Sequence, residues 1–155
     1  MRSTIVYFSK FGNTQKVAEA IASVLEASGT VRVISTNQLS ASELDESDLI
    51  IMGSPTHRMN LPEVVRPVLE SLPRRILRGK LTAAFDTSYK MSMWLAPFTA
   101  APKLAQKLRR LGGKRVIHPE TFHVVGKDGP LYDGELERAK KWTALILQRA
   151  EAQKI

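Results

Sequence analysis

A short apolar run that leads directly into a helical pattern is the feature that most constrains this chain. Residues 4–8 are Thr-Ile-Val-Tyr-Phe, the loop Ser9-Lys10-Phe11-Gly12-Asn13-Thr14 follows, and apolar residues then recur every three or four positions through 17–25. This order predicts a buried strand, a tight loop and the N-terminus of a helix. Free backbone N–H groups and the helix dipole favour an anion at such a place, so the loop is a candidate phosphate site.

The side chains of this loop suit one terminal phosphate group. Ser9 and Thr14 offer hydroxyl donors, and Gly12 permits a sharp backbone turn. A single glycine is too few for the G-x-G-x-x-G or Walker patterns, so a pyrophosphate is a poorer fit. The plainer alternative is an ordinary strand-to-helix turn in which Asn13 or Thr14 caps the helix.

Composition predicts a single domain over residues 1–155, with 43% hydrophobic residues to form a sizeable core. No apolar run approaches the roughly 20 residues that a membrane span requires. Because no leader precedes the first strand, we expect a complete, cytoplasmic protein. The lack of cysteine excludes disulfides, thiolate catalysis and iron–sulfur ligation, and the three histidines lack metal-ligand spacing, so no metal site is expected.

The net charge of +8 is concentrated in the middle of the chain. Residues 66–115 carry twelve basic and two acidic side chains, whereas residues 1–65 carry five basic and seven acidic ones. Such a segment would attract an acidic-faced partner, although a simply solvated helix face would look the same. Aromatic residues are not interleaved with the cations as a stacking surface requires, so we expect no nucleic acid partner.

Strand and helix patterns alternate along the chain, which is typical of an α/β protein with a doubly wound parallel sheet. Strands are predicted at 3–8, 31–34, 48–53, 81–85 and 114–117, the last resuming at 121–125 after Pro119. Helices are predicted at 14–27, in 37–46 behind Ser40 or Ser42, from Pro62 to Leu72, at 101–111, and to Ala150 after Asp133, which is the predicted N-cap of the last helix. Pro67 must kink the third helix or lie in an irregular first turn.

The helix patterns also predict which side chains face the sheet. In the third helix these are Val64, Val65, Val68, Leu69 and Leu72. In the last helix they are Leu136, Ala139, Trp142 or Thr143, Ile146 and Ala150.

Three segments of the chain resemble flavodoxins. Ser9-x-x-Gly12-Asn13-Thr14 resembles their phosphate loop, Gly53-Ser54-Pro55-Thr56 resembles the loop after their third strand, and residues 122–139 are similar to the tail of short flavodoxins. The resemblance implies a five-stranded sheet of order 2-1-3-4-5 with helices on both faces. It also implies an FMN cofactor held by the loops after strands one, three and four.

Carried onto this sequence, the resemblance implies a set of cofactor-binding residues. The first loop would hold the phosphate, the second would line the ribityl chain and ring, and the third would contact the ring. The residues are Ser9, Lys10, Phe11, Gly12, Asn13, Thr14, Pro55, Thr56, His57, Arg58, Thr87, Ser88, Tyr89, Lys90 and Trp94.

Some of these assignments have alternatives. Tyr89 and Trp94 are both candidates to stack on the flavin, and the alternative for Trp94 is to cover the hydrophobic core. His57 is either a proton relay or an ordinary loop histidine. No catalytic residue is expected, because the flavin itself supplies the redox chemistry.

The resemblance implies an electron-transfer protein that cycles FMN between its oxidised and reduced states, with a protein redox partner. Two departures matter: Phe11 cannot donate a hydroxyl to a phosphate, and flavodoxins are usually acidic. Cations at Lys10, Arg58 and Lys90 should raise the flavin potential.

One alternative function is that of an FMN-dependent NAD(P)H or quinone oxidoreductase, including the protoporphyrinogen-oxidase type. Another is a flavin-free docking domain with a basic face. The oligomeric state is left open.

Overall fold

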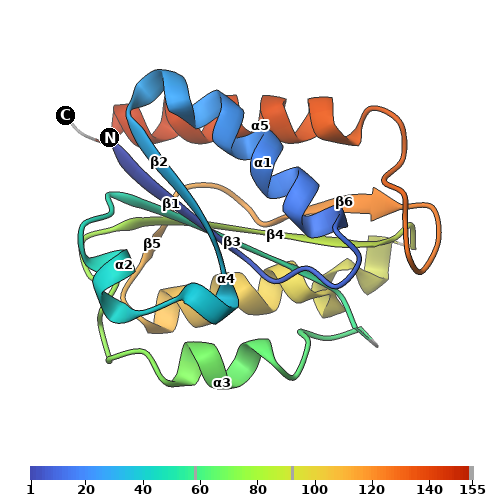
Figure 1. The fold of residues 1–155 in the computed structure, drawn as a ribbon, viewed down its shortest axis with the longest axis horizontal. Coiled ribbons are helices and arrows are strands. Elements are labelled where there is room, and N and C mark those ends of the chain that lie inside the picture. The colour runs from blue at the N-terminus through green and yellow to red at the C-terminus, as the bar shows by residue number, and fades with distance from the viewer. Residues whose placement is uncertain (58, 92, 154–155) are drawn as a thin grey trace.

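A parallel sheet forms the centre of the protein in a computed structural model that describes residues 1–57, 59–91 and 93–153 (Figure 1). Its strand order is β2-β1-β3-β4-β5, with β6 also paired to β4, and every pair is parallel. The predicted fold class and strand order are therefore confirmed. The strands are β1 (Arg2–Tyr7), β2 (Thr30–Ser35), β3 (Leu49–Pro55), β4 (Leu81–Tyr89), β5 (Lys114–Arg115) and β6 (Glu120–Val124).

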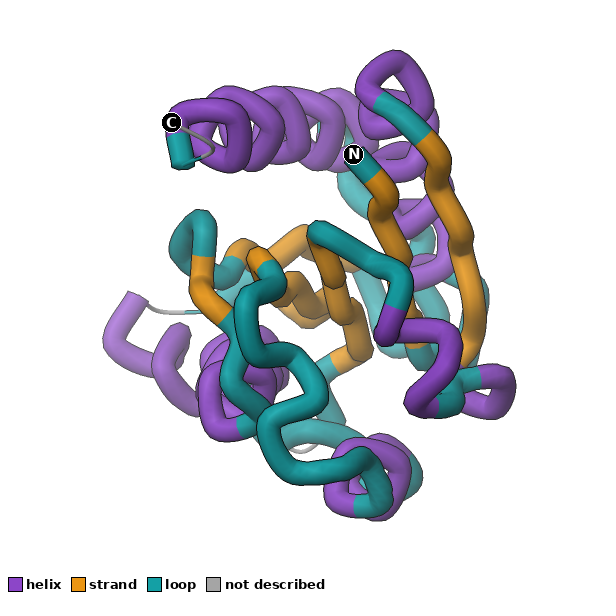
Figure 2. Tube along the Cα trace, turned by 90° about the vertical axis from the view of Figure 1, so that its left-hand side faces the viewer, coloured by secondary structure: helices purple, strands orange, loops and turns teal. Residues whose placement is uncertain are grey.

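Helices cover both faces of the sheet, as predicted (Figures 1 and 2). The two longest, α1 and α5, lie side by side on one face, and α2, α3 and α4 lie on the other. The α-helices are α1 (Asn13–Leu25), α2 (Ala41–Asp45), α3 (Val65–Glu70), α4 (Ala100–Arg110) and α5 (Glu135–Ala152). Three short 3-10 helices are η1 (Glu26–Ser28), η2 (Thr36–Gln38) and η3 (Met93–Phe98).

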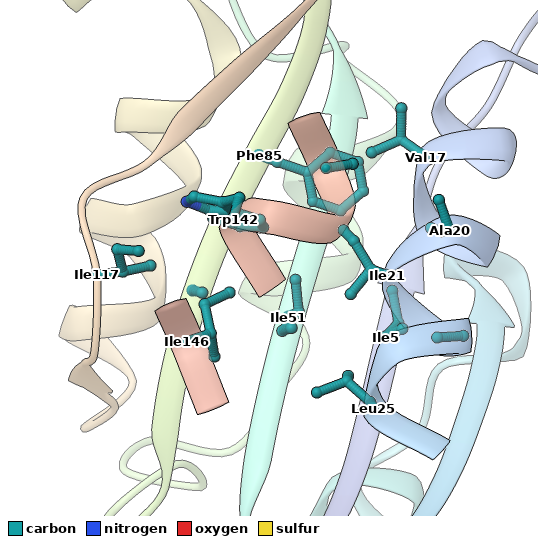
Figure 3. Close-up of a cluster of buried hydrophobic side chains, with 14 of the residues drawn as sticks. Ile5, Val17, Ala20, Ile21, Leu25, Ile51, Phe85, Ile117, Trp142 and Ile146 are labelled. Carbon is teal, nitrogen blue, oxygen red and sulfur yellow. The ribbon is translucent and has the colours of Figure 1, made fainter. Parts of the chain in front are cut away.

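Two hydrophobic cores follow from the alternation of side chains along the strands. Ile5 and Ile51 face α1 and α5 (Figure 3), whereas Val6 and Ile50 face α3 and α4. In the first core three aromatic rings from β4, β6 and α5 pack edge to face, with centroids 6.0 to 6.3 Å apart. They belong to Phe85, Phe122 and Trp142.

The fifth strand is interrupted, which bears on the site. Its first part, β5, pairs with the start of β4, and its second part, β6, pairs with Phe85–Tyr89 at the end of β4. The predicted break near Pro119 is confirmed. Because β6 supplies hydrogen bonds along this stretch, β4 continues to Tyr89 instead of ending at Phe85, and Thr87 and Ser88 lie in a strand rather than a loop.

Several helix details differ from the prediction. Gly134, at φ +87°, is the N-cap of α5 instead of Asp133, and Leu136 is exposed because the helix buries Glu135 in its first turn. Trp142 and Thr143 are both buried, which satisfies both alternatives. The cap of α2 is Ser40, one of the two candidates.

The third helix starts later than predicted. It begins at Val65, so Val64 remains outside it and exposed. Pro67 then falls in the first turn, where its missing N–H would have no partner inside the helix, so no kink is needed.

A partly buried ionic cluster attaches the start of α5 to β6. The carboxylate of Glu135 accepts hydrogen bonds from the His123 backbone N–H (2.6 Å) and from two nitrogens of Arg138 (3.0 and 2.7 Å). Burial alone would raise the pKa of Glu135, but the hydrogen bonds from Arg138 and His123 outweigh it and hold that pKa below its ordinary value of 4.5. The ionised carboxylate therefore stabilises the fold.

Replacing this carboxylate should destabilise the protein. Because the folded-state pKa of Glu135 is lowered, its contribution is present above the unfolded pKa and is lost as the pH falls through the folded pKa. We expect Glu135→Gln to reduce the free energy of unfolding at pH 7 by about 1–3 kcal/mol. The difference from the parent protein should shrink toward pH 3, as measured by urea denaturation. The exposed neighbour Glu137→Gln is the control, and an equal loss in both variants would contradict the prediction.

Candidate functional site

A cleft of about 970 Å³ opens at the carboxyl ends of β1, β3 and β4. This volume lies within the range of roughly 300–1,000 Å³ that is typical of sites for small molecules and cofactors. Most of the residues predicted for the cofactor site line it. They are Ser9, Lys10, Phe11, Asn13, Thr14, Pro55, Thr56, His57, Thr87, Ser88 and Tyr89.

Among the described residues, three of the predicted ones do not line the cleft: Gly12, Lys90 and Trp94. Gly12 shapes the backbone beneath it, and Lys90 lies with its Nζ 4.2 Å from the centre of the Tyr132 ring. Trp94 lies on η3, is 74% exposed and does not line the cleft. Its position therefore differs from the place at the cofactor site that the resemblance implied. The reason is the greater length of β4, which leaves Tyr89 at the cleft and carries Trp94 away from it. Arg58 lies outside the described residues.

The loop after β1 presents the N-terminus of α1 to the cleft. Gly12 is the N-cap at φ +91°, a conformation that favours glycine, and its N–H donates to Ser9 Oγ (3.0 Å). Neither Asn13 nor Thr14 is the cap, contrary to the plainer alternative. The first turn of α1 holds no acidic side chain and the cap makes no side-chain hydrogen bond, so the positive end of the helix dipole is not neutralised there.

Thr14 attaches this loop to the end of β4. Its hydroxyl and that of Thr87 are 2.9 Å apart in a buried hydrogen bond. Two of the three segments predicted to form the site are thus joined directly at the cleft.

The turn after β6 adds a further wall. Asn13 Nδ2 donates to the carbonyl oxygen of Asp128 (3.1 Å), and a Cβ on Gly129 would lie 2.5 Å from that nitrogen. Only glycine permits this close approach. Lys127 and Val124 line the cleft as a result, and neither was predicted to belong to the site. The turn follows the carboxyl end of the fifth strand, and that position was the signal that could have identified it.

The loop after β3 is held from below by several hydrogen bonds. The Thr56 N–H donates to the Thr87 carbonyl (3.0 Å), and the Thr56 hydroxyl donates to Asp86 Oδ2 (3.1 Å) while it accepts the Ala100 N–H (2.9 Å). His57 and Asn60 then close a tight turn through two backbone hydrogen bonds of 2.8 Å.

The segment after this turn continues along the cleft wall and was not predicted. No sequence motif indicated that this segment would reach the cleft. The lining residues of this segment that were not predicted are Asn60, Leu61, Pro62, Glu63 and Val64, and Phe8, directly after β1, was also not predicted.

Asp86 connects this loop to helix α4. Its side chain is fully buried, and Oδ2 also accepts the Ala101 N–H (2.8 Å) in the first turn of α4. Burial raises the pKa of Asp86, against the opposing effect of hydrogen bonds from Ala101 and from threonine hydroxyls that include Thr56. We assign Asp86 a positioning role, because it lies below the cleft and does not line it.

His57 lies in the cleft wall with its ring edge against Phe8, at a centroid distance of 6.4 Å. Partial burial, and to a lesser extent the charge of Lys10, lower the pKa of His57 from its ordinary value of 6.5. The imidazole is therefore mainly neutral at pH 7 and can act as both a hydrogen-bond donor and an acceptor.

Within residues 1–57, 59–91 and 93–153, no helix combines the length and apolar character that crossing a bilayer requires. Over the same residues, no cluster of histidine and acidic side chains could hold a metal ion.

The comparisons with known proteins agree on one family. A family model described as flavodoxin matches residues 5–142. A flavodoxin from Clostridium saccharobutylicum is 34% identical over 90 residues, which are 57% of this chain and 56% of that protein, so the aligned part spans little more than half of that relative.

Solved structures share the fold along nearly the whole chain. A flavodoxin from the domain Archaea has a TM-score of 0.76 at 23% identity and covers 97% of this chain and 99% of its own. Flavodoxin 1 from Bacillus cereus has a TM-score of 0.75 at 22% identity, covering 96% and 98%. Rubredoxin:oxygen oxidoreductase from Desulfovibrio gigas has a TM-score of 0.77 at 22% identity, covering 97% of this chain but 36% of its own.

At these identities the structural matches establish the fold, and the family assignment comes from the sequence match. Neither the NAD(P)H or quinone oxidoreductase nor the flavin-free docking domain is favoured by these relatives. Because the family model covers most of its length, the chain belongs to the flavodoxin family.

Proposed function

We propose that residues 1–155 act as a single flavodoxin-like domain that holds FMN in the 970 Å³ cleft and exchanges electrons with a cytoplasmic protein partner. The observation that carries the proposal is the unneutralised N-terminus of α1, which opens into a cleft lined by the loops after β1, β3 and β4. Bound FMN supplies the redox chemistry, and the protein supplies binding, orientation and electrostatics.

The loop from Ser9 to Thr14 would hold the phosphate. Its backbone N–H groups and the helix dipole favour a dianion, and Lys10 adds a cation at the cleft wall. Phe11 is 45% exposed in this loop and can offer only its backbone N–H, so the loop has fewer side-chain donors than a hydroxyl-rich one.

The opposite part of the cleft would hold the ribityl chain and ring. Thr87 and Ser88 line this part of the cleft and would offer their hydroxyls to polar groups of the ligand, and Tyr89, 49% exposed at the end of β4, is the candidate for stacking on the ring. His57 would present a neutral donor and acceptor to this region. We assign no residue as a catalytic acid or base.

The charge pattern supports a protein partner with an acidic face. Residues 66–115 carry twelve basic and two acidic side chains, and one of the two acids, Asp86, is buried. Exposed cations of this kind raise association rates with an oppositely charged partner, and the effect weakens with salt.

Replacing Ser9 by aspartate should weaken FMN binding through its phosphate. The new carboxylate can still accept the Gly12 N–H and should not harm the helix, because acidic groups stabilise helix N-termini. It would repel the phosphate, so we expect the Kd for FMN to rise at least about tenfold, or roughly 1.4 kcal/mol. Fluorescence titration with FMN and with riboflavin is the measurement.

Riboflavin has no phosphate, and its affinity should change little in Ser9→Asp. Ser9→Asn, which adds similar bulk without a charge, is the matched control. An equal loss of FMN and riboflavin binding would place the phosphate elsewhere, and a parent protein that binds neither flavin would refute the proposed function.

The pKa of His57 should depend on Lys10. We expect His57 to titrate below 6.5, and Lys10→Met should raise its pKa because a nearby positive charge is removed. NMR titration of the imidazole C–H signals measures both values. An unchanged His57 pKa in Lys10→Met, with Lys16→Met as the matched control, would show that Lys10 does not act on the ring.

The same substitution should lower the flavin potential. A reduced flavin would carry additional negative charge, and the Lys10 cation at the cleft wall would stabilise that charge. Lys10→Met should therefore shift the midpoint potential to more negative values, by an energy on the order of 1 kcal/mol. Anaerobic spectroelectrochemical titration would detect this, and a shift to more positive values would contradict it.

A further inference from the structure

A second, smaller cleft of about 280 Å³ adjoins the first one and is strongly cationic. The two clefts share Asn60 and Leu61 in their walls. Three of its cations come from one face of α4 and one from α3, and none of the described residues that line it is acidic. They are Lys103, Lys107, Arg110 and Arg66.

The cations of this second cleft are not neutralised by the protein itself. Among residues 1–57, 59–91 and 93–153, none of the four forms an ion pair with a carboxylate. Arg66 and Arg110 are exposed, whereas Lys103 and Lys107 are partly buried. Gathering four like charges around one small hollow is unfavourable unless an anion offsets them.

Lys103 links this hollow to the larger cleft. Its Nζ donates to the carbonyl oxygen of Met59 (3.0 Å), inside the turn that His57 and Asn60 close. Met59 has φ +60°, a conformation that non-glycine residues adopt rarely. The lysine therefore helps to hold an unusual turn in place, and that turn follows directly on His57 in the wall of the larger cleft.

We propose that the hollow formed by Arg66, Lys103, Lys107 and Arg110 binds carboxylate side chains of the protein redox partner, and that this contact draws Lys103 away from the Met59 carbonyl. Docking of the partner would thereby alter the 57–60 turn beside the flavin. The effect of docking on the flavin rests on the proposed function, in which the larger cleft holds FMN. The contact between the hollow and the partner's carboxylates does not depend on flavin.

The size and the chemistry of the hollow favour acidic side chains. A volume of about 280 Å³ is smaller than typical sites for whole small ligands, so it suits one or two side-chain groups better than a dinucleotide. Guanidinium groups pair with carboxylates in a bidentate manner, and lysine has three donors, so Lys103 can exchange a carbonyl acceptor for a charged one. The charge of residues 66–115 would guide such a partner to this face.

The experiment titrates the FMN-loaded, isotope-labelled protein with a peptide of six glutamates and, separately, with inorganic phosphate. NMR follows the amide signals of Met59, Asn60 and residues 103–110, and absorbance follows the flavin bands. We expect the peptide to shift both sets of signals and the flavin bands in the parent protein. Binding should be lost in 0.5 M salt, because salt screens exposed charges: the Debye length falls from about 10 Å at 0.1 M to about 3 Å at 1 M.

Three variants test the role of Lys103. Lys103→Gln should weaken peptide binding about fivefold and abolish the response of the flavin bands, whereas Lys103→Arg should retain both. Lys114→Gln removes the same charge from the far end of the sheet, where Lys114 pairs with Leu81, and should change binding less than Lys103→Gln does.

The outcomes separate the possibilities. Equal weakening in Lys103→Gln and Lys114→Gln would overturn the site and leave only a net-charge effect. If inorganic phosphate shifted the same amide signals and flavin bands at the same concentration as the peptide, the assignment of the hollow to partner carboxylates would be overturned. Peptide binding without any shift of Met59 or Asn60 would overturn the coupling. If the protein binds no FMN, the proposed function fails, and the same titration of the flavin-free protein still decides the carboxylate contact through Met59 and Asn60.

Discussion

The hydrogen bonding of β1 between β2 and β3 is the interaction on which the arrangement of the site depends. The register pairs Ile5 with Val33 on one side and with Ile51 on the other, so β1 lies inside the sheet although it comes first in the chain. From β1 the chain proceeds to one side and later returns to the other, and the loops after β1 and β3 therefore diverge from neighbouring strand ends. The cleft lies where they diverge.

Hydrogen bonds among the residues at the cleft then limit how far its walls can move apart. Thr14 bonds Thr87 at the end of β4, Thr56 bonds Asp86, and Asn13 reaches the carbonyl of Asp128. Each of these contacts joins residues far apart in the sequence, and each includes at least one residue that lines the cleft. The lining residues are thus positioned by contacts between separate parts of the chain.

Most of the fold could be predicted from the sequence because it depends on local patterns. The apolar run of residues 48–53 and the helical spacing of apolar residues in 17–25 reflect the burial of one or both faces of each segment. Such patterns can be recognised without knowing which elements the segment packs against. The strand that was predicted too short, β4, is extended by pairing with β6, and that partner is 30 or more residues away. Its extra length decides whether Tyr89 or Trp94 reaches the cleft, so the choice of aromatic residue could not be made from the sequence.

The site was predicted in part for the same reason. Loops with a recognisable pattern, such as Ser9 to Thr14, could be placed at the cleft, but the wall from Asn60 to Val64 has no such pattern. Lys127 could have been found from topology, since the carboxyl ends of all strands in a parallel sheet meet at one edge. Contacts such as that of Lys103 with Met59 depend on how α4 packs, which only the three-dimensional structure reveals.

Helix α4 brings together the charge of the surface and the geometry of the cleft. Its first residues donate N–H groups to Thr56 and Asp86, one turn later Lys103 reaches Met59, and Arg109 and Arg110 in its last turn are exposed. The same helix therefore supports the loop after β3 from below and presents much of the basic surface. A partner that binds this surface electrostatically would act on a rigid element already bonded to the cleft wall. The basic charge of the chain would then influence the cleft itself, in addition to solubility and the rate of association.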